Sequence, residues 1–281
     1  MTRSIKSILV ALCLSLALTS TAFAQTDKDV HYGEGALQEM DIYPAAVADS
    51  PLVMLVHGGG WVSGDKKGLD TPARELQAEG FAVFNTDYRL ASLAEKTEAF
   101  PMEAEDVQKA TEYAMAHAAT YNASASKVFL IGGSAGGNLV EEATIRLNEA
   151  KAETVRGTVA LSGASDLWTL VEANRGFGED LVEALGVANL QPDAETPEKE
   201  ALAKAYSPAR HLVASTKSVA WQLFESQENE LMPKDQYDEM KAAIEGLSGN
   251  VTGRLVARKA HAFAYWGSVE AEIYSFIKTH E

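Results

Sequence analysis

Short apolar runs alternate with amphipathic stretches along most of the chain. Strand-like apolar runs lie at residues 37–43, 52–56, 81–86, 127–131, 155–161, 218–224 and 253–257. Apolar residues at helical spacing lie at residues 71–79, 103–119, 138–148 and 270–278. Strands that alternate with helices predict an α/β fold, with a mostly parallel central sheet flanked by helices on both faces.

The alternation is interrupted between about residues 168 and 206, where Glu, Asn, Gly and Ala dominate. This stretch follows a predicted strand, so we expect a small insertion at the carboxyl end of the sheet. Two interpretations stay open for it: a cap over a pocket near the active site, and a surface excursion without that role.

The first 24 residues have the pattern of a secretory signal peptide. Arg3 and Lys6 precede an apolar run over residues 8–18, and Ala22-Phe23-Ala24 supplies a small-x-small cleavage site. The run is shorter than an ordinary membrane span, which makes a retained anchor the less favoured alternative. We therefore expect a secreted or periplasmic protein, with residues 25–281 forming a single domain without a membrane span.

Charge and cysteine content narrow the classes of function. Acidic residues number 40 and basic residues 24, and a net charge of −16 disfavours nucleic acid and anionic membranes as partners. Cys13, the only cysteine, lies in the predicted leader, so the mature chain would have no thiol nucleophile, disulfide or cysteine metal site. No nucleotide-binding glycine loop or metal-ligand cluster is visible, and the sequence predicts neither a cofactor nor a metal.

Candidate chemistry is concentrated at residues 132–136, which read Gly-Gly-Ser-Ala-Gly. This G-x-S-x-G pattern lies between a predicted strand and a predicted helix. A sharp strand-to-helix turn would expose the Ser134 hydroxyl as a nucleophile. Gly132 and Gly136 are needed because a side chain at either position would crowd the turn.

Acyl transfer by a serine also needs hydrogen-bond donors for the developing oxyanion. The segment His57-Gly-Gly-Gly-Trp61 follows a predicted strand, and its glycines leave backbone N–H groups unobstructed. We expect the N–H groups of Gly59, Gly60 and Ala135 to form the oxyanion hole. His57 and Trp61 are expected to support this loop.

The general base is expected near the C-terminus, after the nucleophile and the acid in chain order. His261 meets this condition, because it follows the last predicted strand and precedes the last helix. The acid that orients it should follow the strand at 218–224, where Glu228, Asn229 and Glu230 are candidates, and Asp166 is a further option. A carboxylate would fix the tautomer of His261 and stabilise its charged form, whereas an asparagine could only orient the ring.

These motifs resemble the α/β-hydrolase superfamily, in its hormone-sensitive-lipase-like and feruloyl/acetyl-esterase-like carboxylesterase branch. The resemblance is carried, in order, by residues 57–61, Asp87-Tyr-Arg-Leu90, Phe100-Pro101 and Gly133-Ser-Ala-Gly-Gly-Asn-Leu139. It implies Ser134 as nucleophile, His261 as base, and Gly59, Gly60 and Ala135 as oxyanion donors.

Two positions depart from the branch that the chain resembles. The branch usually has an acidic residue where Gly133 stands. An alignment on Leu231-Met-Pro233 puts Asn229 where the acid usually lies, and a shift of one residue would restore Glu228 or Glu230. Of these candidates we favour Glu228.

The sequence thus predicts a serine hydrolase that cleaves carboxylic esters through an acyl-enzyme. The resemblance and the leader imply short-chain acyl esters, or acetyl and feruloyl esters linked to polysaccharide, as substrates. An amidase or lactonase with the same Ser–His machinery is one alternative. A non-catalytic ligand-binding member of the fold is another, and Asn229 is its support in the sequence.

Overall fold

The computed structural model describes residues 25–92, 100–173, 201, 203–229 and 231–281, and its described strands form one sheet. The order across the sheet is β1-β2-β4-β3-β5-β6-β7-β8. These strands are β1 (Asp27–His31), β2 (Glu39–Tyr43), β3 (Ser50–Val56), β4 (Ala82–Thr86), β5 (Ala123–Gly133), β6 (Gly157–Leu161), β7 (Ala220–Ser226) and β8 (Asn250–Val256). The pairs β1–β2 and β2–β4 are antiparallel, and all pairs from β4–β3 to β7–β8 are parallel.

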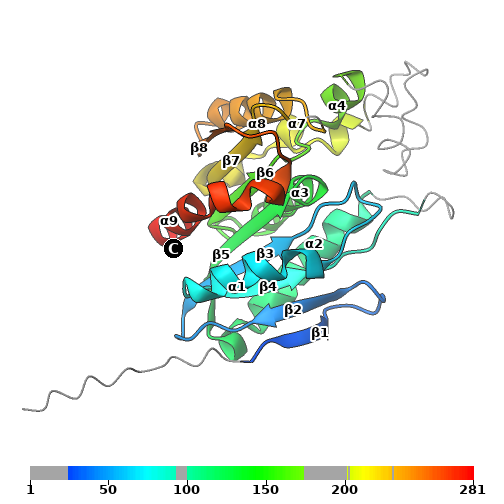
Figure 1. The fold of residues 1–281 in the computed structure, drawn as a ribbon. Coiled ribbons are helices and arrows are strands. Elements are labelled where there is room, and N and C mark those ends of the chain that lie inside the picture. Colours follow the sequence, from blue (N-terminus) through cyan, green and yellow to red (C-terminus); the bar gives the residue numbers. More distant parts are fainter. Residues whose placement is uncertain (1–24, 93–99, 174–200, 202, 230) are drawn as a thin grey trace, which may run out of the picture.

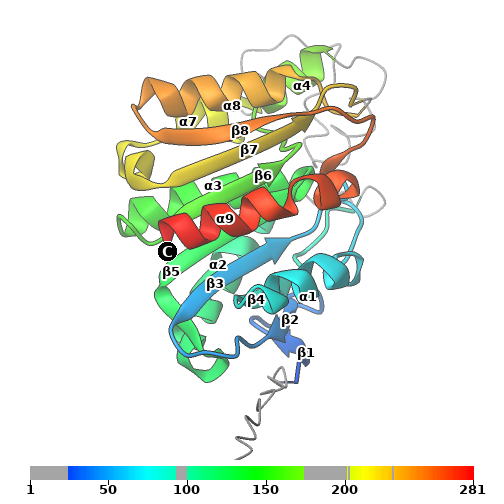
Figure 2. The ribbon, with the colours of Figure 1, turned by 60° about the vertical axis from the view of Figure 1, so that its left-hand side comes forward.

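Helices cover both faces of the sheet (Figures 1 and 2). Helices α1 (Asp70–Ala78) and α9 (Glu270–His280) lie on one face, where Leu76 and Ile273 share a core with Leu55 of β3. Helices α2 (Met102–Ala116), α3 (Ala135–Ala150) and α8 (Asp235–Gly246) lie on the other, where Leu139 shares a core with Met54. Successive β3 side chains therefore enter opposite cores, which explains the strand's continuous apolar sequence and confirms the α/β prediction.

Shorter elements complete the described part of the chain. They are the α-helices α4 (Leu167–Ala173) and α7 (Pro208–His211), and the 3-10 helices η1 (Lys66–Leu69), η2 (Ala118–Tyr121), η3 (Ala214–Ser218) and η4 (Ala262–Ser268). Strand β1 and helix α8 were not predicted. β1 is mostly exposed and polar, so no apolar alternation marks it. α8 buries Gln236, Met240 and Ile244 at a spacing of four, a helical signal that the sequence did contain.

The carboxyl ends of five parallel strands lie along one edge of the sheet. Val56 at the end of β3 pairs with Gly132 of β5, and Leu161 at the end of β6 pairs with Gly133 and with Phe224 of β7. Ser226 at the end of β7 pairs with Val256 at the end of β8. Because these strands are parallel, the loops that follow them all leave from the same edge of the sheet, where ligands bind in open α/β sheets.

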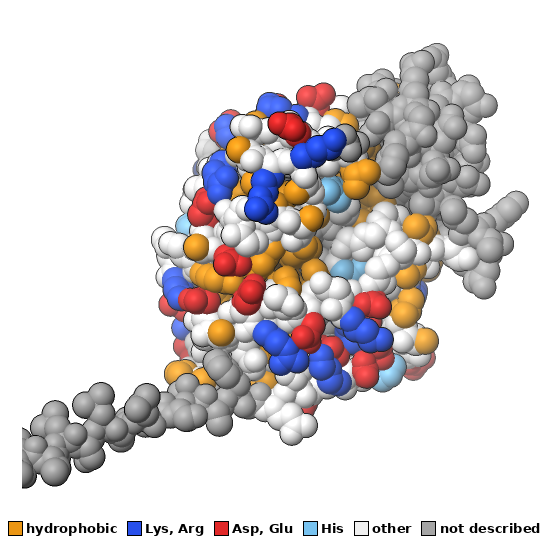
Figure 3. Space-filling model, in the orientation of Figure 1, with side chains coloured by type: hydrophobic (Ala, Val, Ile, Leu, Met, Phe, Trp, Pro, Cys, Tyr) orange, Lys and Arg blue, Asp and Glu red, His pale blue; other side chains and the backbone are white. Residues whose placement is uncertain are grey.

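Several predictions fall on residues outside the described ranges: the leader over 1–24, Glu230, and residues 174–200 and 202 of the expected insertion at 168–206. Within the described ranges, no helix combines the length and apolar character that crossing a membrane requires. On the face shown in Figure 3, acidic and basic side chains are mixed, and neither sign forms a separate patch there.

Candidate active site

Ser134 occupies a sharp turn between β5 and α3. Its backbone angles are φ 57° and ψ −126°, a conformation that a non-glycine residue rarely adopts. A Cβ atom added at Gly132 would lie 2.1 Å from the Gly136 carbonyl oxygen, and one at Gly136 would lie 2.3 Å from the His57 oxygen. The predicted need for glycine at both positions is confirmed. The strained turn presents Ser134 at the N-terminus of α3.

A steric contact explains why glycine occupies position 133, where the resemblance led us to expect an acidic residue. A Cβ atom there would lie 2.8 Å from the ring of Phe263 and 3.0 Å from the Cβ atom of Ala262. The segment that follows His261 thus packs directly on the backbone beside the nucleophile. A side chain at position 133 would therefore require the Phe263 ring to move and would crowd the Cβ atom of Ala262.

The glycine loop after β3 lies against the nucleophile. A Cβ atom at Gly58 would be 2.9 Å from the Ser134 Cβ atom, and Gly59 and Gly60 have φ angles of +122° and +59°. None of the backbone hydrogen bonds found in loops and turns of the described chain is donated by Gly59, Gly60 or Ala135. Their N–H groups are available to an oxyanion, and the positive end of the α3 dipole adds to this potential.

His57 braces the loop from behind. Its ring stacks on Tyr88 with centroids 4.3 Å apart, and its Nδ1 donates a hydrogen bond to the Gly58 carbonyl at 2.6 Å. Its Nε2 lies 3.5 Å from Asp87 Oδ1, and burial lowers the pKa of His57. Trp61 is buried, with its ring 5.9 Å from Phe100. Both residues hold the loop, as expected.

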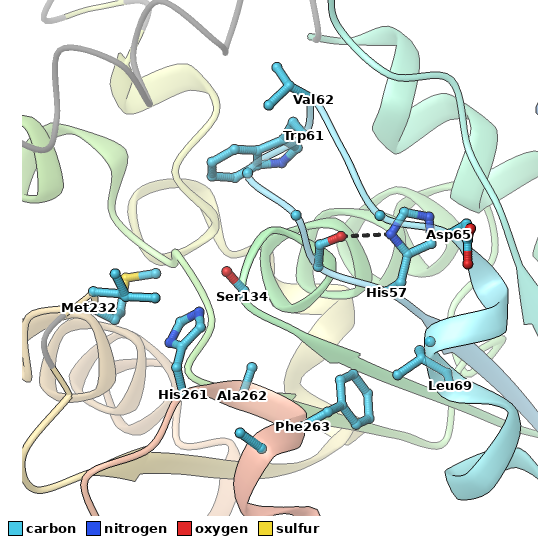
Figure 4. Close-up of a pocket in the computed structure, with 17 residues that line it drawn as sticks. His57, Trp61, Val62, Asp65, Leu69, Ser134, Met232, His261, Ala262 and Phe263 are labelled. Carbon is cyan, nitrogen blue, oxygen red and sulfur yellow. Dashed lines mark hydrogen bonds between the residues drawn. The ribbon is translucent and has the colours of Figure 1, made fainter.

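Ser134 and His261 line the same pocket, which has a volume of about 960 Å³ (Figure 4). Apolar side chains make up much of the remaining wall, among them Leu69, Met232 and Phe263. No hydrogen bond joins Ser134 Oγ to His261 within the described part of the chain. In enzymes without substrate such contacts are often long, and they shorten when the substrate binds.

Asn229 is the residue that contacts the far side of the imidazole. Its Nδ2 lies 2.9 Å from His261 Nδ1, while its Oδ1 accepts hydrogen bonds from the backbone N–H groups of Leu231 and Met232. Burial lowers the pKa of His261 to about 4. The ring is therefore neutral near pH 7, and Nδ1 faces an amide NH₂ group where a serine hydrolase needs an acceptor.

The preference for Glu228 as the acid was wrong. Glu228 is exposed, and its backbone N–H donates to Ser226 Oγ at 3.3 Å, while Asn229 holds the position beside the imidazole. Asp166 has a different task as well. It is fully buried, caps α4 by accepting from the N–H of Trp168, and pairs with Arg210.

Glu225 is a residue of the site that sequence reasoning missed. It is 1 % exposed near the end of β7. Its Oε1 accepts hydrogen bonds from Asn229 Nδ2 at 2.7 Å, from Ser162 Oγ at 2.8 Å and from the Ser226 N–H at 2.6 Å. Burial raises the pKa of Glu225, and these donors oppose the shift. A carboxylate at the end of an apolar strand was the signal available in the sequence.

A family model and several curated proteins are similar to this chain. The family model described as BD-FAE matches residues 40–244. Versiconal hemiacetal acetate esterase of Dothistroma septosporum is 33% identical over 130 residues, covering 43% of this chain and 37% of that protein. Probable carboxylic ester hydrolase LipM of Mycobacterium tuberculosis is 28% identical over 184 residues, covering 59% of this chain and 42% of that protein. FAD-linked oxidoreductase pytB of Aspergillus terreus is 30% identical over 145 residues, covering 50% of this chain and 17% of that protein.

The chain thus spans less than half the length of these curated relatives. Among solved structures, a truncated carbohydrate esterase from gut microbiota has a TM-score of 0.74 at 17% identity, covering 93% of this chain and 98% of that one. Esterase B from Lactobacillus rhamnosis has a TM-score of 0.71 at 18% identity, covering 91% and 84%. These similarities establish the α/β-hydrolase fold.

Proposed function

The chain belongs to the BD-FAE family, and from this premise we propose that it is a serine hydrolase that cleaves carboxylic esters through an acyl-enzyme. One observation carries the proposal. A strained serine at the start of a helix shares a pocket with a half-buried, neutral histidine and with a loop in which, among the backbone hydrogen bonds of the described chain, none is donated by Gly59 or Gly60. Nucleophile, base and oxyanion donors are the three parts that acyl transfer requires.

The proposed reaction begins with attack of Ser134 Oγ on the ester carbonyl carbon. With the hydrogen of the neutral ring at Nδ1, His261 Nε2 takes the serine proton and later gives it to the departing alkoxide, which leaves as an alcohol. The N–H groups of Gly59, Gly60 and Ala135 stabilise the negative oxygen, and one such donor contributes about 3–4 kcal/mol to the transition state. Water then attacks the acyl-enzyme by the same route and releases the acid.

The lining of the pocket supports uncharged substrates. Val62, Leu69, Met232 and Phe263 face it, and no Lys or Arg is among its described lining residues. An anionic acyl group would lose its hydration there without gaining a counter-charge, because the carboxylate of Asp65 also lines the pocket. We propose short-chain acyl esters, or acetyl and feruloyl esters linked to carbohydrate; the names of the acetate esterase relative and the carbohydrate esterase neighbour are consistent with this choice.

A fluorophosphonate probe and a series of p-nitrophenyl esters of increasing acyl length test the proposal. We expect covalent labelling and hydrolysis by the wild type, with both lost in Ser134→Ala. Amides and lactones in the same assay separate an amidase or lactonase from an esterase. If Ser134→Ala hydrolyses esters as fast as the wild type, the assignment of the nucleophile is wrong.

A second candidate is a ligand-binding protein that retains the pocket without turnover. The amide of Asn229 beside His261 Nδ1 favours it, because the comparable Asp-to-Asn change in a serine protease lowers kcat by about 10⁴. This candidate predicts no labelling and no hydrolysis at pH 7–9, together with a rise in Tm when an ester or its acid is added.

We also propose that the protein acts outside the cytoplasm. The basic start, apolar run and small-x-small site of residues 1–24 support export. Mass spectrometry of protein recovered from the periplasm or the medium should find a mature N-terminus at Gln25. A full-length chain confined to the cytoplasmic fraction would contradict the proposal.

A further inference from the structure

Behind the active-site histidine, an amide and a carboxylate lie in a row. Asn229 Nδ2 is 2.9 Å from His261 Nδ1 and 2.7 Å from Glu225 Oε1. The Glu225 carboxylate therefore does not contact the imidazole, because the Asn229 amide lies between them. A serine–histidine pair works as nucleophile and base when a carboxylate accepts directly from Nδ1–H.

The orientation of the Asn229 amide is set at both ends. Its Oδ1 accepts from the N–H groups of Leu231 and Met232, at 3.0 and 3.2 Å. Its Nδ2 faces the carboxylate oxygen of Glu225. Rotating the amide by half a turn would place two donors against each other at one end and two acceptors at the other. Both clashes oppose the rotation.

Glu225 is itself held firmly. Ser162 Oγ and the Ser226 N–H donate to the same oxygen that receives the Asn229 amide. The Ser162 hydroxyl lies 2.9 Å from the hydroxyl of Tyr265, which donates to the carbonyl of Phe224 in β7. This network of buried groups fixes the carboxylate on the sheet, and the carboxylate in turn fixes the amide.

The amide orientation determines where His261 carries its proton. Because Nδ2 donates to Nδ1, the neutral imidazole has its lone pair at Nδ1 and its hydrogen at Nε2. Nε2 is the nitrogen that must accept the serine proton. A ring already protonated there cannot act as the base until its proton has moved to Nδ1.

We infer that Glu225 and Asn229 are a transposed acid–amide pair, in which Glu225 is a positioning residue that holds the Asn229 amide toward His261, keeps the proton on Nε2 and so limits hydrolysis. The inference rests on the proposed function. It names two positions at which an exchange of carboxylate and amide would put the carboxylate where the imidazole can use it.

The double substitution Glu225→Gln/Asn229→Asp makes this exchange without changing net charge or the number of side-chain heavy atoms. Because the Ser226 N–H donates to Glu225 Oε1, the glutamine introduced at position 225 keeps its amide oxygen there, and the rotatable Ser162 hydroxyl, 3.2 Å from Asn229 Nδ2, can donate to the carboxylate introduced at position 229. We expect kcat/KM on p-nitrophenyl acetate to rise over wild type by up to about 10⁴-fold, the loss in kcat that the comparable Asp-to-Asn change causes in a serine protease.

The single variants separate the inference from a general effect of adding an acid. Asn229→Asp alone puts a second carboxylate oxygen about 2.7 Å from Glu225 Oε1, so the two must share a proton and the gain should be smaller. Glu225→Gln alone leaves the amide beside His261 and should give no gain. Glu228→Gln/Asn229→Asp is the matched control: it removes an exposed carboxylate and should behave like Asn229→Asp.

A measurement without substrate reads the tautomer itself. Nitrogen-15 NMR of the histidine rings, with the His261 signals assigned from their loss in His261→Gln, should show Nε2–H in the wild type and Nδ1–H in the exchanged variant at pH 7. Nδ1–H in the wild type would overturn the inference. An exchanged variant no faster than the wild type, while the wild type hydrolyses esters, would also overturn it. Absence of hydrolysis and probe labelling in every variant would instead refute the proposed function. The two failures can be told apart, because the NMR measurement reports the tautomer of His261 without any substrate.

Discussion

The contact between Gly136 and the strand before the oxyanion loop gives a prediction that joins the two halves of the active site. Gly136 lies in the first turn of α3, just after the nucleophile. A Cβ atom added there would be 2.3 Å from the His57 oxygen and 2.5 Å from the Val56 oxygen. Both atoms are backbone, so no side-chain rotation can relieve the overlap in Gly136→Ala.

The size of the expected effect follows from these distances. Ordinary van der Waals contacts of Cβ begin at 3.4 Å, so helix α3 and the end of β3 must separate by about 1 Å. Overpacking of this kind lowers the free energy of unfolding by about 1–3 kcal/mol. The same displacement moves the oxyanion donors at Gly59 and Gly60 away from the one at Ala135. A misplacement of about 1 Å costs on the order of 10²-fold in rate.

Two assays separate these effects. Urea unfolding gives the change in stability, and p-nitrophenyl acetate hydrolysis below the unfolding transition gives kcat and KM. Gly246→Ala is the matched control, since a Cβ atom at the end of α8 meets nothing within 4 Å, and we expect wild-type kcat and no loss of stability. If Gly136→Ala keeps kcat within threefold of wild type, the oxyanion hole does not depend on this contact.

Three further predictions concern pH, a buried charge and the Gly133 contact. Burial lowers the pKa of His261 to about 4, so the imidazole is neutral above that pH. We therefore expect kcat/KM to stay level from pH 8 down to about pH 5 and to decrease at lower pH. A decrease in kcat/KM with a midpoint near pH 6.5 would contradict this. The Lys66 ammonium is buried among Asp29, Glu39 and Asp87, so Lys66→Met should lower the free energy of unfolding by about 3 kcal/mol in urea, whereas the exposed Lys241→Met should leave it unchanged. Gly133→Ala should lower stability by about 1–3 kcal/mol through its contact with Phe263, and Phe263→Ala in the same chain should recover part of that loss; equal unfolding midpoints for wild type and Gly133→Ala would refute the contact.

The sequence predicted the elements whose periodicity reports burial. Strands β3, β4 and β6 are buried throughout and mostly apolar because both faces of the sheet are covered, and helix α3 shows the spacing of a packed helix. β1 escaped prediction because it lies at the sheet edge with exposed side chains, and hydrophobic pattern carries no information there. The order of the strands could not be predicted from the hydrophobic pattern either, because β4 lies between β2 and β3 in the sheet although it follows both in the chain.

In the active site, local geometry was predictable where it needs particular residues. Glycine at 132 and 136 reveals the turn that carries Ser134, because other residues would collide with neighbouring backbone. The reason for Gly133 was not visible, since its neighbour Phe263 lies far along the chain and meets it only after folding.

The chain alone determined which residue types were available: a serine on a turn, a histidine after the last strand, a glycine loop, and a short acidic segment after β7. Tertiary structure alone decided which member of that segment faces the imidazole. Two backbone N–H groups and the buried carboxylate of Glu225 turn Asn229 inward, while Glu228 remains in solvent. The backbone angles of a loop decide in which direction each of two neighbouring side chains points. Here those angles depend on contacts with β6, β7 and the His261 segment, and the local sequence pattern contains no information about these contacts.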